Sequence, residues 1–165
     1  MARPTILRVL LLIPAAWAAW LLFEAAHEAG HVLHAAASGG RVVRVELPLL
    51  GFSRTDVSPN PCPAIVAWGG PAWGSVLPVV AWAAVPSRWP AARRAARAFA
   101  GFCLVANGSY LAAGCAGHVG DAGDLLRHGT PAWLVVAAGS AAAAAGLWVW
   151  HGLGGRPAGR QAARE

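Results

Sequence analysis

The stretch LLFEAAHEAGHVLHAAA, residues 21–37, places five ionisable side chains in an otherwise apolar, helix-forming sequence. At about 100° per residue, these side chains fall within an arc of roughly 120° on one side of a helix; they are Glu24, His27, Glu28, His31 and His34. His27 and His31 are one turn apart, so their imidazoles can bind one Zn²⁺ together. Glu28, beside the first histidine, is placed to act as a general base on a water molecule. Ionisable groups are costly in a membrane, so this stripe predicts a functional site.

The composition predicts a membrane protein of all-α class. The chain has 165 residues, of which 57% are hydrophobic and 12% are charged, whereas a soluble domain has about 25% charged residues. This length allows about four spans of roughly 20 residues. We expect a single integral membrane domain over residues 1–165, with four transmembrane helices at approximately 5–37, 63–85, 91–117 and 131–151. A cleaved signal peptide is the alternative for the first segment, but the apolar run continues past Glu24 without a turn signal.

The segment between the first two spans predicts a short β-hairpin, at approximately 41–58. Apolar residues alternate at Val43, Val45 and Leu47, and Gly51 offers a turn before a second extended stretch. We expect this hairpin at the membrane surface. It either covers the helix ends or offers a free edge that holds an extended peptide by strand addition.

The arginines predict the orientation. With four spans, one side of the membrane has nine arginines and the other has four, Arg41, Arg44, Arg54 and Arg127. The positive-inside rule therefore places the N-terminus in the cytoplasm and the histidine motif toward the outer end of the first span. The net charge of +6 does not indicate nucleic-acid binding, because the arginines flank apolar segments and form no stripe with aromatic residues.

A catalytic zinc site needs a third protein ligand. Asp121 and Asp124 lie in GDAGDLLRHG, residues 120–129, on the same side of the membrane as the C-terminal end of the first span. Alternatively, Asp121 caps a short helix and Asp124 occupies its third position. Glu24 either orients a ligand imidazole or faces a polar cavity, and His34 either supports the site or lies at the interface.

Several motifs together resemble the site-2 protease family of intramembrane zinc metalloproteases, in particular its small, minimal bacterial members. They are HEAGH at 27–31, SGGRV at 38–42, GGP at 69–71 and Asp121-Ala122. The resemblance covers about residues 20–135. It implies a Zn²⁺ cofactor held by His27, His31 and Asp121, with Glu28 as base. Asp121 is favoured over Asp124 because the similar small members carry an Asp-Ala pair here, although the family's usual Leu-Asp-Gly-Gly is absent. Asn107 resembles a membrane asparagine that contacts substrate in the family; a helix–helix hydrogen bond is the alternative.

The resemblance implies intramembrane peptide hydrolysis in a bacterial cytoplasmic membrane. The expected partners are the lipid bilayer and a membrane protein or peptide substrate that is cleaved within or beside the membrane. The alternative is a non-proteolytic membrane protein with the same fold that acts as a binding or chaperone-like protein or as a metal carrier. The intact Glu28 favours the hydrolase, because a binding-only zinc site does not need this acid.

Overall fold

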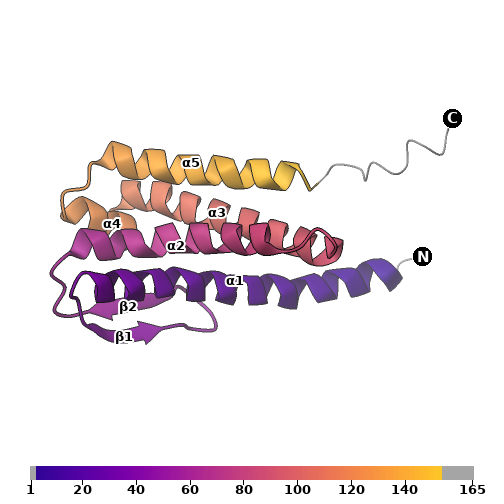
Figure 1. Ribbon diagram of the computed structural model, residues 1–165, viewed down its shortest axis with the longest axis horizontal. Helices are drawn as coiled ribbons and strands as arrows, with labels where there is room; N and C mark the ends of the chain where they lie inside the picture. Colours follow the sequence, from indigo (N-terminus) through magenta and orange to yellow (C-terminus); the bar gives the residue numbers. More distant parts are fainter. Residues whose placement is uncertain (1–2, 154–165) are drawn as a thin grey trace.

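Four long helices lie side by side, and a short helix and a β-hairpin lie near one end of the bundle (Figure 1). The computed structural model describes residues 3–153. Its elements are α1 (Arg3–Ala37), β1 (Val42–Glu46), β2 (Arg54–Val57), α2 (Pro63–Ala84), α3 (Pro90–Gly117), α4 (Gly120–Arg127) and α5 (Ala132–His151). The start of α1 and the end of α5 lie at the same end of the bundle. The predicted fold class is confirmed, and the predicted spans agree with the helices to within two residues.

The four long helices fit an integral membrane protein. The residues Leu10–Ala37, Pro63–Ala84, Pro90–Gly117 and Ala132–His151 are each long and apolar enough to cross a membrane. At 1.5 Å per residue, even 20 residues extend about 30 Å, the thickness of the hydrocarbon layer. A helix satisfies its own backbone hydrogen bonds, as a lipid environment requires.

Glycines allow the helices to pack with their backbones in contact. A Cβ atom on Gly30 of α1 would overlap the carbonyl oxygen of Gly69 in α2, and a Cβ atom on Gly69 would overlap that of Gly30. Gly108 of α3 and Gly139 of α5 form a second close approach of the same kind. Van der Waals packing of small residues is a main force between helices in lipid. Helix α2 continues unbroken through Pro71 and Pro78.

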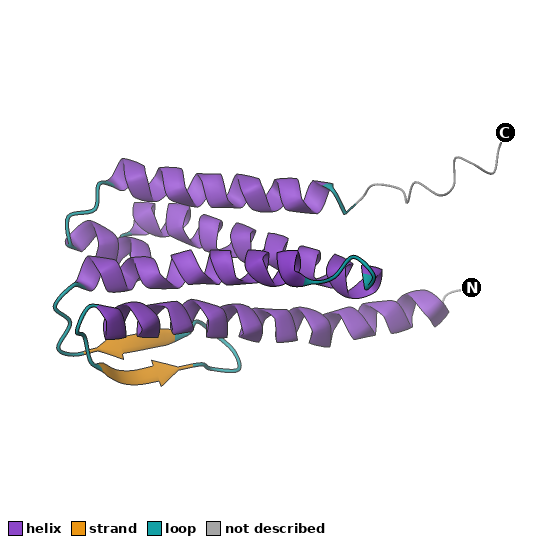
Figure 2. Cartoon of the chain, in the orientation of Figure 1, coloured by secondary structure: helices purple, strands orange, loops and turns teal. Residues whose placement is uncertain are grey.

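The hairpin lies beside the C-terminal half of α1 (Figure 2). Strands β1 and β2 pair antiparallel, with Val45 opposite Thr55. The loop between the strands runs back along α1, where the Trp17 indole Nε1 donates a hydrogen bond of 2.9 Å to the Leu49 carbonyl. Trp17 lies ten residues before His27, about 15 Å along the helix. The predicted hairpin is therefore present, but its loop lies alongside the bundle and exposes the apolar side chains of Leu49 and Leu50.

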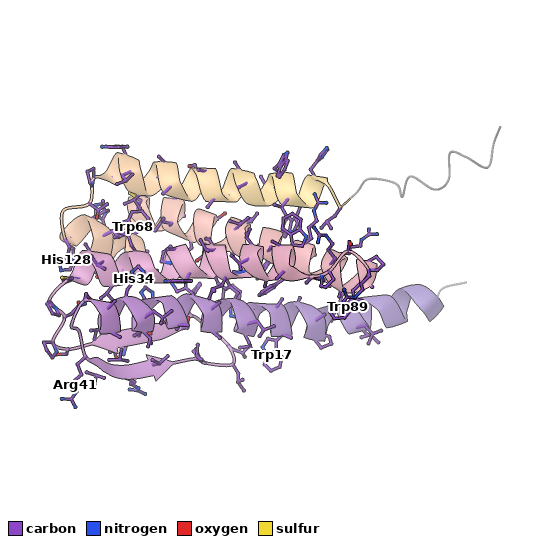
Figure 3. The ribbon with its side chains drawn as sticks, in the orientation of Figure 1. Trp17, His34, Arg41, Trp68, Trp89 and His128 are labelled. Atoms are coloured by element: carbon purple, nitrogen blue, oxygen red, sulfur yellow. The ribbon has the colours of Figure 1, made fainter. Side chains whose placement is uncertain are left out.

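The two ends of the bundle differ in charge. Arg88, Arg93, Arg94 and Arg97 lie at the turn between α2 and α3 and the start of α3. Trp89 marks this end in Figure 3, and His34, Arg41 and His128 mark the opposite end. The acidic residues of the described chain all lie in that opposite half, on α1, the hairpin and α4. Three arginines that entered the orientation argument, Arg156, Arg160 and Arg164, lie outside the described residues.

This arrangement predicts that the α2–α3 turn and the end of α5 face one compartment and the α4–α5 loop faces the other. Reporter fusions after Ser87 and after Leu153 should therefore give the same signal, and a fusion after Gly129 should give the opposite one. An alkaline phosphatase and a green fluorescent protein reporter at each position provide complementary measurements. Agreement between the fusions at Ser87 and Gly129 would contradict the four-span arrangement.

Candidate metal centre

One face of α1 presents four ionisable side chains to the interior of the protein. Glu24, His27, Glu28 and His31 are each at most 7% exposed. A ligand atom from each of His27, Glu28 and His31 lies within 4.8 Å of the others, so this group can hold a metal ion. The spacing follows from the helix, because positions four apart lie on one face.

Neighbouring helices fix the orientation of both imidazoles. His31 Nδ1 donates to the Val66 carbonyl of α2 at 2.8 Å. A carbonyl can only accept, so His31 carries its proton on Nδ1, and in the neutral ring Nε2 presents a lone pair. His27 Nδ1 lies 2.8 Å from Asn107 Oδ1 of α3, which favours the same tautomer. A partner on the remote ring nitrogen is the usual support of a metal-binding histidine.

The carboxylate of Asp121 lies between the two Nε2 atoms. Its Oδ2 is 2.8 Å from His27 Nε2, and its Oδ1 is 3.3 Å from His31 Nε2. Burial raises the pKa of Asp121, but hydrogen bonds donated by His27 and His31 when Nε2 carries a proton outweigh this effect and bring the pKa to about 2. Asp121 is therefore a carboxylate at neutral pH. When both rings carry their proton on Nδ1 only, the two Nε2 atoms and the carboxylate all present lone pairs, and a cation between them takes the place of the Nε2 protons.

The backbone of Gly70 leaves the space beside these donors free. A Cβ atom at this position would overlap Nε2 of both His27 and His31. Glycine is therefore the one residue that lets α2 approach the imidazoles without filling the place where a shared ion would lie. Ligand atoms on a tetrahedral zinc ion are roughly 3.3 Å apart, close to the spacing of His31 Nε2 and Asp121. The donor set and the space thus fit a metal ion.

Asp124 is arranged differently from Asp121. Both line the cavity beside the motif, but the carboxylate of Asp124 forms an ion pair with Arg127 on the same helix and its side chain is 48% exposed. Helix α4 begins at Gly120, and the residue before it, Val119, makes no side-chain cap. Asp121 is therefore the second residue of the helix, not its cap, and its carboxylate contacts the histidines. The alternative in which it caps the helix is wrong.

The hairpin holds the two glutamates of α1. Glu28 Oε1 accepts a hydrogen bond of 2.7 Å from the Ser53 hydroxyl, and Oε2 accepts one of 2.5 Å from the Thr55 hydroxyl. Glu24 Oε1 accepts from the Ser53 backbone N–H at 3.1 Å, and its Oε2 accepts no hydrogen bond from the described residues. The two hydroxyl residues are two apart, so they project from one face of the extended chain toward α1.

The remaining candidates lie at the edge of this cluster. Asn107 is 1% exposed and bridges α3 to His27. His34 lies one turn beyond His31, where its Nδ1 donates to the Ile65 carbonyl at 2.8 Å, and it does not join the group that can hold a metal. Sequence reasoning gave no role to Ser53, Thr55 or Tyr110, whose ring lies edge-on to His27 at a centroid distance of 6.1 Å. Gly70 entered it only through the GGP motif at 69–71.

A cavity of about 820 Å³ adjoins the cluster and is lined by α1, the hairpin, α2, α3 and α4. Of the acids that line it, Asp56 pairs with Arg54 and Asp124 pairs with Arg127. Among the described residues no arginine pairs with Glu24, Glu28 or Asp121, which also line it. These three acids make the lining suited to a cation.

Comparison with models of protein families, with curated proteins and with solved structures finds no match to this chain.

We predict that Gly70→Ala weakens metal binding although it removes no ligand, because the new methyl group occupies the space beside both Nε2 atoms. The affinity for Zn²⁺, measured by competition with a chromogenic chelator in detergent, should fall at least about tenfold. Gly117→Ala is the matched control, since its Cβ would lie 3.5 Å from Val119, an ordinary contact. Equal affinities of the two variants would contradict the placement of the ion.

The two aspartates of α4 give a second matched pair. Asp121→Ala should weaken Zn²⁺ binding by about 100-fold, as expected for loss of a ligand, whereas Asp124→Ala should bind like the wild type because its carboxylate faces Arg127. Circular dichroism of both variants checks that the helices persist. Loss of metal from Asp124→Ala alone would show that the third ligand is Asp124, one helical turn further along α4, and not Asp121.

Proposed function

We propose that this chain is a zinc-dependent intramembrane peptide hydrolase of the site-2 protease type. The observation that carries the proposal is the position of Asp121 between the Nε2 atoms of His27 and His31, with Glu28 beside them. Two histidines and one carboxylate form a ligand set of catalytic zinc sites, which keep a further position open. The HExxH motif, the buried location and the adjoining cavity support the same class.

In the proposed mechanism, His27, His31 and Asp121 would hold Zn²⁺ and Glu28 transfers the proton. When bound, Zn²⁺ would supply Lewis-acid chemistry that activates water and the peptide carbonyl. Glu28 takes a proton from water and returns it to the leaving amine. Each carboxylate oxygen has two lone pairs, so Glu28 can keep its bonds to Ser53 and Thr55 while it accepts this proton. These bonds fix the direction of the carboxylate.

The hairpin is suited to receive an extended peptide. Residues 54–57 of β2 all line the cavity, while β2 pairs with β1 along its other edge. A peptide added to the free edge of β2 would pass close to Thr55, whose hydroxyl contacts Glu28. The proposed substrate is a membrane-embedded or juxtamembrane segment that enters this cavity.

The arginine distribution supports an orientation for the proposed enzyme. The arginines of the α2–α3 turn have no acidic neighbour among the described residues, which is typical of a cytoplasmic loop. We propose a cytoplasmic N-terminus in a bacterial cytoplasmic membrane, with the metal centre toward the outer face.

The variant Glu28→Gln tests the hydrolase. It keeps the size of the side chain and removes the base, so it should bind Zn²⁺ like the wild type while cleavage of a co-purified single-span substrate falls by about 10²-fold or more. Glu46→Gln, which changes a glutamate on the outer strand, should cleave normally.

Cleavage by Glu28→Gln at the wild-type rate would show that the mechanism is wrong. A wild-type protein that binds Zn²⁺ but cleaves no single-span substrate would instead favour the non-proteolytic alternative, a binding or chaperone-like protein or a metal carrier with the same fold.

A further inference from the structure

The cavity beside the metal centre has two halves of different chemistry. Toward the end of the bundle marked by His128 in Figure 3, it is lined by polar side chains, including Asp56, Asn60 and His128. Its aromatic lining comes from Trp20, Phe23 and Phe52 on the other side of the motif and from Tyr110, which lies beside His27 and Gly120. Trp20 lies seven residues before His27, about 10.5 Å along α1 and toward the bundle interior. The centre thus lies between a polar half and an aromatic half.

The rings of the aromatic half form a connected set from three parts of the chain. Trp20 on α1 contacts Phe23 and Phe52, with centroid distances of 5.6 and 5.9 Å. Phe52, from the hairpin loop, stacks on Tyr110 of α3 at 6.3 Å. These separations are typical of favourable aromatic pairs. Because each ring is supported by another, the set presents a preformed apolar surface rather than isolated side chains.

One ring of this set is left largely uncovered by the protein. Phe52 is 75% exposed although it lines the cavity. An apolar group that enters beside it would remove surface that folding alone leaves open. Glu24 and Ser53 also line the cavity beside these rings and are joined by a hydrogen bond, so the apolar area and shape of the wall come from the aromatic rings.

We propose that Trp20, Phe23, Phe52 and Tyr110 form a specificity pocket for one large apolar side chain, aromatic or branched aliphatic, of the substrate. The proposal rests on the proposed peptide hydrolase. Phe23 and Tyr110 lie 6.0 and 6.1 Å from the His27 ring, and Trp20 lies about 10.5 Å from His27 along α1. An extended chain advances about 3.3 Å per residue, so the selected side chain lies about two to three residues from the cleaved bond, on the side that faces the bundle interior. A small side chain at this position leaves the rings without contact atoms and loses dispersion energy.

The test uses full-length protein in detergent and a series of single-span peptides. The parent peptide has alanine at every position near the cleavage site, and each other peptide has one phenylalanine, moved position by position. In the wild type, phenylalanine at one position should raise kcat/KM at least about tenfold over the parent. The variant Trp20→Ala should reduce this preference to less than about twofold, while it still cleaves the parent peptide and keeps the wild-type affinity for Zn²⁺.

The matched control is Leu22→Ala, which truncates an apolar side chain of α1 that is 62% exposed and does not line the cavity. It should keep the wild-type preference. Because Phe52 and Trp20 contact each other, Phe52→Ala should weaken the preference for phenylalanine at the same substrate position. A wild type without positional preference, or a preference that survives both Trp20→Ala and Phe52→Ala, would overturn the pocket.

A binding measurement separates failure of the pocket from failure of the hydrolase. If the wild type cleaves no peptide, the dissociation constants of the same peptides are measured by fluorescence anisotropy. The pocket then still predicts tighter binding of one phenylalanine peptide and loss of this difference in Trp20→Ala. Equal binding of all peptides to the wild type would overturn the pocket independently of catalysis.

Discussion

The structure depends on the contact between the backbones of α1 and α2 at Gly30 and Gly69. With no side chain at either position, the two helices approach until the carbonyl of one lies where the Cβ atom of the other would be. This approach brings the Val66 carbonyl to His31 and the backbone of Gly70 to both imidazoles. Gly30, inside the HExxH motif, thus determines how closely the two histidines approach α2. In lipid, where apolar surface gives little drive for helix association, such contacts supply much of the packing energy.

Every buried ionisable group of the cluster is supported from a different part of the chain. Asn107 of α3 supports His27, Val66 of α2 supports His31, and the hairpin supports the two glutamates. Within this network, Glu24 Oε2 and Asn107 Nδ2 have no hydrogen-bond partner among the described residues. A polar network of this kind is costly when one member is missing, because the others are left buried without partners. The cluster and the bundle are therefore mutually dependent.

The sequence predicted the helices well because their signals are local and strong. Long apolar runs bounded by Pro63, Pro90 and Pro131 leave little freedom in the placement of the spans. The histidine spacing is equally local. The contact of Asp121 with the histidines required two further steps, the topology that puts residues 120–129 at the right end and the resemblance that favours the first aspartate.

Other parts of the site have no signature in the residue pattern. The Val66 carbonyl acts through an atom that all residues share, so no choice of side chain marks it. Ser53 and Thr55 follow the alternation of a strand, but the sequence does not specify that the strand folds back against α1. The hydrogen bond that ties the hairpin loop to Trp17 likewise has no signature in the sequence. Such features depend on tertiary geometry, which outweighs local preference.

The separation of charge along the bundle makes the molecule an electric dipole directed across the bilayer. The guanidinium groups at the α2–α3 turn form its positive pole, and the three buried carboxylates without arginine partners lie toward its negative pole. Walls of low dielectric constant concentrate field lines in a cavity, so divalent cations accumulate there above their bulk concentration. Ionic strength screens such attraction over about 8–10 Å in solution but much less within the protein. At the proposed metal site, the rate of metal binding should therefore depend on ionic strength more strongly than the final affinity does.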